Sequence, residues 1–186
     1  MNNIDNIFKH SSNISEFSKS YFEYLGSVIH NISLSEIENF VNLILEARDR
    51  EATIFFIGNG GSAATASHFA NDFSIGTRTY DKPFRVISLC DNQAIITAIG
   101  NDDGYEKIFS QQLRVLLREQ DIVVSISASG NSPNLIDAIN IAKKMNAITV
   151  GISAFDGGQM KDIVDHSLHV PTEKGEYGPA EDAHMV

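Results

Sequence analysis

The chain has little of several residue types whose abundance would point to a special class of protein. It has one cysteine in 186 residues, no tryptophan and four prolines, so no disulfide can form within it. The single thiol, Cys90, suits a reducing compartment. We interpret Cys90 as a small core residue near a strand end and not as a nucleophile.

Basic residues are also scarce. Lysine and arginine total 14 against 24 aspartate and glutamate, which gives a net charge of −10. This balance argues against a nucleic-acid or anionic-membrane partner and favours an ordinary soluble, cytoplasmic protein. The N-terminus lacks the basic start and apolar run of a signal peptide, and no apolar stretch approaches the length of a membrane span. An anionic ligand would therefore have to be held locally, by dipoles and hydroxyl groups.

Hydrophobic residues make up 42% of the chain, which is enough for one sizeable core in a single domain. Residues 1–50 show helical spacing and predict an N-terminal arm of two helices, broken near Asn31, with Ser33 or Ser35 capping the second. Such an arm could pack on its own sheet or on a neighbouring subunit, and the sequence favours neither.

From residue 51 onward, short apolar runs alternate with helical patterns. Strands are predicted at 53–57, 84–89, 121–126, 147–153 and 167–170, with helices at about 63–73, 93–99, 105–118, 135–142 and 160–164. This alternation predicts a doubly wound α/β domain over residues 51–186, with a five-stranded parallel sheet covered on both faces. Ligands bind such sheets beyond the carboxyl ends of the strands, so loops 58–62, 91–92 and 127–132 are expected to line one crevice.

The most informative of these loops is the serine loop, residues 127–132, with the sequence Ser-Ala-Ser-Gly-Asn-Ser. Ser132 stands at the N-cap position of the following helix and Pro133 at its first position. Ser127, Ser129 and Ser132 place three hydroxyl groups at the positive end of a helix dipole, with no acid among them. The pattern predicts an anion site, most simply for a phosphate; the alternative is an ordinary βα turn.

The glycine loop, residues 58–62, has the sequence Gly-Asn-Gly-Gly-Ser. With Ala63 it fits the dinucleotide fingerprint, but the serine loop suits a single phosphate and the lysine of a mononucleotide P-loop is missing. Gly60 and Gly61 fit better as permissive backbone that a small ligand can approach, with Asn59 and Ser62 as hydrogen-bond donors. Purely structural glycines are the alternative.

His68 and Asp72 are four residues apart on the helix that leaves the glycine loop, so they share one face. This spacing can chelate a divalent metal, or place a carboxylate beside an imidazole as a general base. The alternative is a surface pair without a function. The position next to the glycine loop favours a functional pair.

The tail, residues 176–186, looks like the start of a helix, with Pro179 at its first position and acids in the first turn. The sequence stops within two turns, and helices this short are marginal alone. We therefore expect the natural chain to continue, or a partner subunit to support this helix.

Four motifs occur in a characteristic order: Gly58-Asn-Gly-Gly-Ser62, His68-Phe-Ala70, Ala98-Ile-Gly-Asn-Asp102 and Ser127-Ala-Ser-Gly-Asn-Ser132. Through them nearly the whole chain resembles the sugar-isomerase (SIS) domain family and, within it, the phosphoheptose (sedoheptulose-7-phosphate) isomerases. The resemblance implies a flavodoxin-like sheet and a homotetramer with active sites at subunit interfaces. It also implies interconversion of an aldose phosphate with a ketose phosphate.

The resemblance further assigns residues to roles. It implies that the phosphate is bound by Ser127, Ser129 and Ser132, that the sugar is bound by Asn59 and Ser62, and that Asp91 is an active-site aspartate. The catalytic base falls on Asp72, where the family has a glutamate. The family's zinc, where present, would be held by His68, Asp72 and Glu181, the last in place of a usual glutamine. Gly178 stands where an active-site aspartate is common.

These features lead to a main hypothesis and two alternatives. The main hypothesis is a phosphosugar isomerase in which Asp72 moves a proton between adjacent carbons through an enediolate, while His68 or a bound metal stabilises the oxyanion. The first alternative is a non-catalytic phosphosugar-binding or interaction protein on the same fold. The second is a dinucleotide-dependent oxidoreductase that uses residues 58–63.

Overall fold

We describe the protein from a computed structural model, which covers residues 2–186. Its strands are β1 (Thr53–Gly58), β2 (Arg85–Ser88), β3 (Ile122–Ser127), β4 (Ile148–Ala154) and β5 (His166–Val170). Its α-helices are α1 (Asn3–His10), α2 (Ile14–His30), α3 (Leu34–Asp49), α4 (Gly61–Asn71), α5 (Gln93–Asp102), α6 (Ser110–Leu116), α7 (Pro133–Lys144), α8 (Gly158–Ile163) and α9 (Tyr177–His184). None of the helices between residues 2 and 186 is both long and apolar enough to span a membrane.

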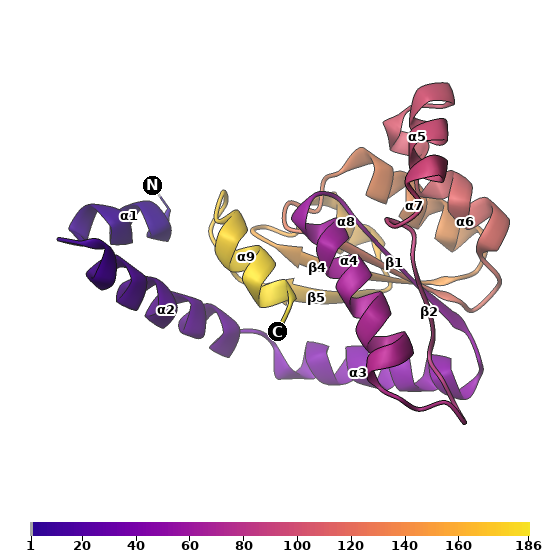
Figure 1. Ribbon diagram of the computed structural model, residues 1–186, viewed down its shortest axis with the longest axis horizontal. Coiled ribbons are helices and arrows are strands. Elements are labelled where there is room, and N and C mark those ends of the chain that lie inside the picture. Colours follow the sequence, from indigo (N-terminus) through magenta and orange to yellow (C-terminus); the bar gives the residue numbers. More distant parts are fainter. Residues whose placement is uncertain (1) are drawn as a thin grey trace.

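The strands form one parallel sheet in the order β2-β1-β3-β4-β5, which is the flavodoxin-like order (Figure 1). The predicted five-stranded, doubly wound sheet is confirmed. The strand order reverses between β1 and β3, whose last paired residues are Gly58 and Ile126. The glycine loop and the serine loop leave these two strands, so the topology places both loops at the switch point where such folds bind ligands.

Helices cover both faces of the sheet, and alternate residues of the central strands supply the two cores. On one face, Phe56 is buried beneath α3 and α4. On the other face, Phe55 and Val123 pack with residues of α6 and α7 such as Leu113 and Leu135. This two-sided burial explains why the central strands are continuous apolar runs without polar alternation.

The N-terminal region contains three helices, where the sequence predicted two. The unpredicted break lies at residues 11–13, where the Asn13 side chain accepts a hydrogen bond from the N–H of Glu16 (3.0 Å) and caps α2. Ser33 caps α3, as one of the two predicted options. Helix α3 packs on the sheet, whereas α1 and α2 project away from it (Figure 1).

Several other boundaries also differ from the prediction, three of them most clearly. The helix expected at 105–118 is a short 3-10 turn, Tyr105–Lys107, followed by the separate helix α6. The helix expected at 63–73 ends in a π-helix, Asp72–Gly76, closed by a 3.0 Å hydrogen bond from the Thr77 N–H to the Asp72 carbonyl. Helix α9 begins at Tyr177, two residues before the expected Pro179. Periodicity does not report these local changes in winding.

A buried carboxylate, Glu176, ties the tail to the projecting helices. It accepts hydrogen bonds from the backbone N–H of Asn3 (2.6 Å), from the backbone N–H of Glu173 (3.1 Å) and from the Tyr24 hydroxyl. Burial and this bond to Glu176 raise the pKa of Tyr24 to about 12. These three hydrogen bonds satisfy the buried carboxylate.

His184, near the end of α9, is 4% exposed, and within residues 2–186 neither of its ring nitrogens has a hydrogen-bond partner with good geometry. Burial lowers the pKa of His184 to about 4, and the nearby His169 adds to the effect. The backbone of Ser153 lies close enough to oppose part of this shift in the pKa. The folded protein therefore holds this imidazole in its neutral form.

This environment predicts a loss of stability in mild acid. The folded-state pKa of His184 lies below its unfolded value. Keeping the imidazole neutral in the folded protein therefore costs no free energy of unfolding above pH 6.5, and this cost grows as the pH falls toward 4. The shift corresponds to about 3 kcal/mol, lost from the free energy of unfolding over this window. Urea denaturation between pH 7.5 and 4.5 should show a steeper decline for the wild type than for His184→Gln. Parallel declines in the two proteins would contradict this assignment.

Candidate functional site

The serine loop folds back on itself through its own hydroxyl groups. The Ser127 Oγ accepts a hydrogen bond from the N–H of Gly130 (3.1 Å), and the Ser129 Oγ accepts one from the N–H of Asn131 (3.4 Å). The loop thereby turns tightly between β3 and α7. Ser127 is buried in it, whereas Ser129 is partly exposed.

Ser132 occupies the N-cap of α7, and Pro133 is the first residue of the helix, as predicted. The Ser132 side chain makes no capping bond, although its carbonyl accepts from the N–H groups of Leu135 and Ile136. Its hydroxyl group is thus available to a ligand at the positive end of the helix dipole. No acidic side chain lies within the serine loop, so the arrangement suits an anion.

A second loop, residues 155–158 after β4, supports the serine loop through direct backbone contact. A Cβ atom on Gly130, whose φ is +61°, would lie 1.9 Å from the carbonyl oxygen of Gly157. The Gly130 carbonyl accepts from the N–H of Met160 (2.9 Å), and the Asn131 side chain accepts from the N–H of Gln159 (3.0 Å). The shape of the predicted anion site therefore depends on a contact between two loops that only glycine permits.

The glycine loop is equally compact. A Cβ on Gly58 would lie 2.5 Å from the carbonyl oxygen of Ser62, and Gly60 has a φ of +55° as the N-cap of α4. Gly61 faces the carboxylate of Glu181 from α9, which a side chain at Gly61 would displace. Ser62 itself is buried. Gly58 and Gly60 are therefore needed for the backbone conformation of the loop.

His68 and Asp72 form the pair that their spacing predicts. The His68 Nε2 lies 3.2 Å from the Asp72 Oδ2, and about half of each side chain is exposed. The other oxygen of Asp72 accepts from the side-chain amide of Asn71 (3.0 Å). The pair sits where α4 passes into the π-helix, a change of winding that is frequent at functional sites.

The predicted metal ligands His68, Asp72 and Glu181 do not converge. Glu181 lies against Gly61 at the start of α4. His68 lies almost two helical turns further along α4, which corresponds to a rise of about 10 Å along the helix axis. Residues 2–186 contain no group of three or more His, Cys, Asp or Glu side chains arranged to hold a metal ion. Within one chain, these three residues therefore do not form a site that suits zinc. The chemistry proposed below uses no metal ion. The zinc site stays a prediction.

Asp91 follows β2 and receives a hydrogen bond from the hydroxyl of Ser67 on α4. Ser67 also contacts the hydroxyl of Ser88 (3.3 Å). The exposed Asp91 carboxylate is thus held next to the helix that carries His68 and Asp72. Sequence reasoning missed Ser67, because nothing in its local pattern indicates a contact with a residue 24 positions away.

Asn59 in the glycine loop exchanges two hydrogen bonds with Asn134 in the first turn of α7. The hydroxyl of Tyr105 donates a third bond to the Asn59 Oδ1 (3.0 Å). Asn59 therefore has one amide N–H left for a ligand. The sequence did not predict that Asn134 and Tyr105 contact Asn59. An asparagine that follows a proline, as Asn134 does, is typical of an ordinary helix start.

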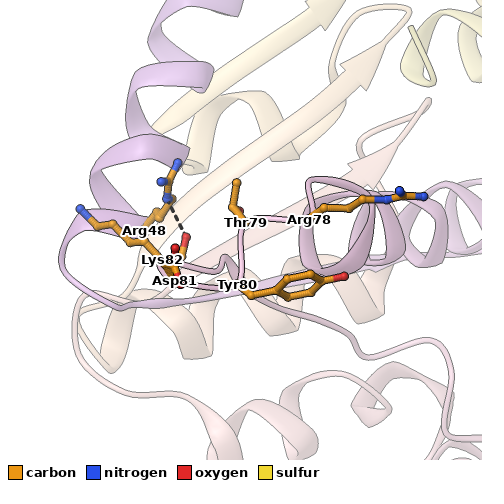
Figure 2. A pocket seen from close by; sticks show the side chains of 6 residues that line it. All are labelled: Arg48, Arg78, Thr79, Tyr80, Asp81 and Lys82. Atoms are coloured by element: carbon orange, nitrogen blue, oxygen red, sulfur yellow. Dashed lines mark hydrogen bonds between the residues drawn. The ribbon is translucent and has the colours of Figure 1, made fainter.

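A cavity of about 410 Å³ lies at the opposite, amino-terminal edge of the sheet (Figure 2). Figure 2 shows the side chains of Arg48, Arg78 and Lys82 extending in different directions from it. Lys82 is already paired with Asp49, and the Arg48 Nε donates to the Lys82 carbonyl. Because its cations diverge and are partly neutralised, this cavity is a weaker anion site than the serine loop.

Comparisons with known proteins agree with this geometry. A family profile described as SIS domain matches residues 20–154. Phosphoheptose isomerase 1 of Campylobacter jejuni is 38% identical over 74% of each chain, and phosphoheptose isomerase of Aliarcobacter butzleri is 35% identical over 87% of this chain and 85% of its own. The structure of phosphoheptose isomerase from Neisseria gonorrhoeae superposes with a TM-score of 0.82 at 28% identity, covering 93% of both chains.

The contact at Gly130 predicts that Gly130→Ala disrupts the serine loop, because the new methyl group would collide with the Gly157 carbonyl. We expect the affinity for a sugar phosphate to fall at least about tenfold, or about 1.4 kcal/mol, by isothermal titration calorimetry. Gly26→Ala is the matched control, since a Cβ there meets no atom within 4 Å on α2. Wild-type affinity in the Gly130→Ala protein would contradict the proposed loop geometry.

Proposed function

The chain belongs to the SIS domain family and is phosphoheptose isomerase-like, and we propose that it interconverts a ketose phosphate and an aldose phosphate of the sedoheptulose 7-phosphate type. The observation that carries this proposal is the serine loop, which bears three hydroxyl groups and leads into the N-terminus of α7 at the switch point of the sheet. Relatives named phosphoheptose isomerase, 35–38% identical over most of the chain, support it.

We assign the phosphate to the serine loop, through Ser127, Ser129 and Ser132. The sugar would then extend along the glycine loop toward α4. Its hydroxyl groups would meet Asn59, Gly60, Gly61, Ser62 and Asp91. The buried position of Ser62 and the bonds already made by Asn59 leave the glycine-loop backbone as a major part of this surface.

The chemistry that this arrangement supports is proton transfer between adjacent carbons. In the ketose-to-aldose direction, Asp72 takes the proton from C1, the C1–H electron pair forms the C1–C2 double bond, and the carbonyl electrons move onto O2. The proton returns at C2, while the proton on O1 passes to O2 and leaves an aldehyde at C1. We assign to His68, which lies 3.2 Å from Asp72, the stabilisation of the enediolate oxygens.

A second candidate function is phosphosugar binding without turnover. It is favoured by the aspartate at position 72, whose carboxylate is one methylene, or about 1.5 Å, short of a glutamate's reach. Glu181 and Gly178 add to this case, because they differ from the residues that the family usually has. Tight binding of sedoheptulose 7-phosphate by calorimetry, with no proton exchange at C1 or C2, would select this function over the isomerase.

Replacement of the base tests the isomerase directly. We expect the wild type to exchange protons at C1 and C2 of sedoheptulose 7-phosphate, followed by NMR, and Asp72→Asn to lower the rate at least about 100-fold. Asp72→Glu keeps a carboxylate with a longer reach and should retain activity. Unchanged exchange in Asp72→Asn would eliminate Asp72 as the base.

We also propose that the protein is a cytoplasmic homotetramer. Helix α3 exposes one apolar stripe, formed by Leu34, Ile37, Val41 and Leu45, while its opposite side packs on the sheet. Such an exposed stripe is typical of a subunit interface. A partner subunit on α3 would bury it and would complete the active site implied by the family.

A charge on this stripe should weaken the assembly. We expect sedimentation velocity to give a tetramer for the wild type and smaller species for Val41→Glu, because a buried carboxylate would lie unpaired in the interface. Asn42→Glu, one residue along and exposed off the stripe, is the control and should leave the mass unchanged. A monomeric wild type at micromolar concentration would contradict the assembly.

A further inference from the structure

Two asparagine side chains join the glycine loop to the start of α7. The Asn59 Nδ2 donates to the Asn134 Oδ1 (2.9 Å), and the Asn134 Nδ2 donates to the Asn59 Oδ1 (2.8 Å). The Tyr105 hydroxyl adds a third bond to the Asn59 Oδ1, and the N–H of Leu135 adds one to the Asn134 Oδ1. We call Asn59, Asn134 and Tyr105 the amide clamp.

The clamp is well suited to fix a distance. Asn134 is 2% exposed, and three hydrogen bonds determine which way its amide faces. The doubled amide pair allows little rotation of either side chain, and a buried amide that lost its partner would pay the cost of desolvation. The three members come from three separate segments, which follow β1, β3 and α5.

The position of the clamp gives it a function. Helix α4 begins at Gly61, two residues after Asn59, and carries His68 and Asp72. Asn134 lies two residues after Ser132, the last residue of the serine loop. Fixing Asn59 against Asn134 therefore fixes the helix of the proton-transfer pair against the phosphate anchor.

We propose that Asn134 and Tyr105 are positioning residues, which act through Asn59 to set the separation between the phosphate anchor and the proton-transfer pair. This inference rests on the proposed isomerase function. A sugar held by its phosphate presents its C1 and C2 to Asp72 only if this separation matches its length, and an error of 1 Å can cost about 100-fold in rate.

The proposal distinguishes two parts of the site. The serine loop keeps its own shape through Gly130, Met160 and Gln159, and the hydrogen bonds described within residues 2–186 do not link these three residues to the clamp. Loss of the clamp should therefore leave the binding of inorganic phosphate unchanged. It should reduce kcat for the sugar phosphate, because the anchor stays while the reacting groups shift.

The experiment compares N59A, N134A, Y105F and the double variant N59A/N134A with the wild type. We expect kcat to fall about 100-fold in N134A and a few-fold in Y105F, with the affinity for inorganic phosphate unchanged in both. The double variant should be no slower than the slower of N59A and N134A, because both remove the same clamp. N140A, exposed on the same helix, is the control and should behave as the wild type.

Three results would overturn the proposal: unchanged kcat in N134A, weaker phosphate binding in proportion to kcat, or multiplicative effects in the double variant. Tyr105 is 59% exposed, so Y105F tests the clamp even if N134A fails to fold. If the wild type shows no proton exchange, the isomerase function fails on its own. The clamp is then tested by the added affinity of sedoheptulose 7-phosphate over inorganic phosphate, which should disappear in N134A but not in N140A.

Discussion

The close approach of Gly130 to the Gly157 carbonyl is the constraint on which the candidate site depends. Two loops from adjacent strands, β3 and β4, meet there with no room for a side chain. This contact fixes the tight turn of the serine loop just ahead of the N-terminus of α7. Without it, the same three serines would form an ordinary turn.

The net charge of −10 makes this local arrangement necessary. The protein cannot attract an anion by its overall field, so the proposed anion site relies on hydroxyl groups and a helix dipole in place of cations. The lysine and arginine residues at the opposite edge of the sheet do not replace it, because Lys82 is paired with Asp49 and the side chains diverge (Figure 2). Recognition therefore depends on geometry more than on charge.

The sequence was sufficient for the strands, the sheet class and the serine loop, since each depends on local patterns such as apolar runs and the Ser132-Pro133 helix start. It was insufficient where the cause lies far along the chain. The bond of Ser67 to Asp91 and the pairing of Asn59 with Asn134 need the sheet order to bring them together. The π-helix at Asp72 and the extra break before α2 are changes of winding that hydrophobic periodicity does not report.

The central claim is that the serine loop anchors a phosphate, and amide chemical shifts measure this most directly. In a ¹H–¹⁵N titration with sedoheptulose 7-phosphate, the largest shifts should fall on the backbone amides of residues 127–132 and 134, followed by residues 58–62. Inorganic phosphate should shift the first group alone. Shifts centred on residues 78–82, or none near α7, would contradict the account.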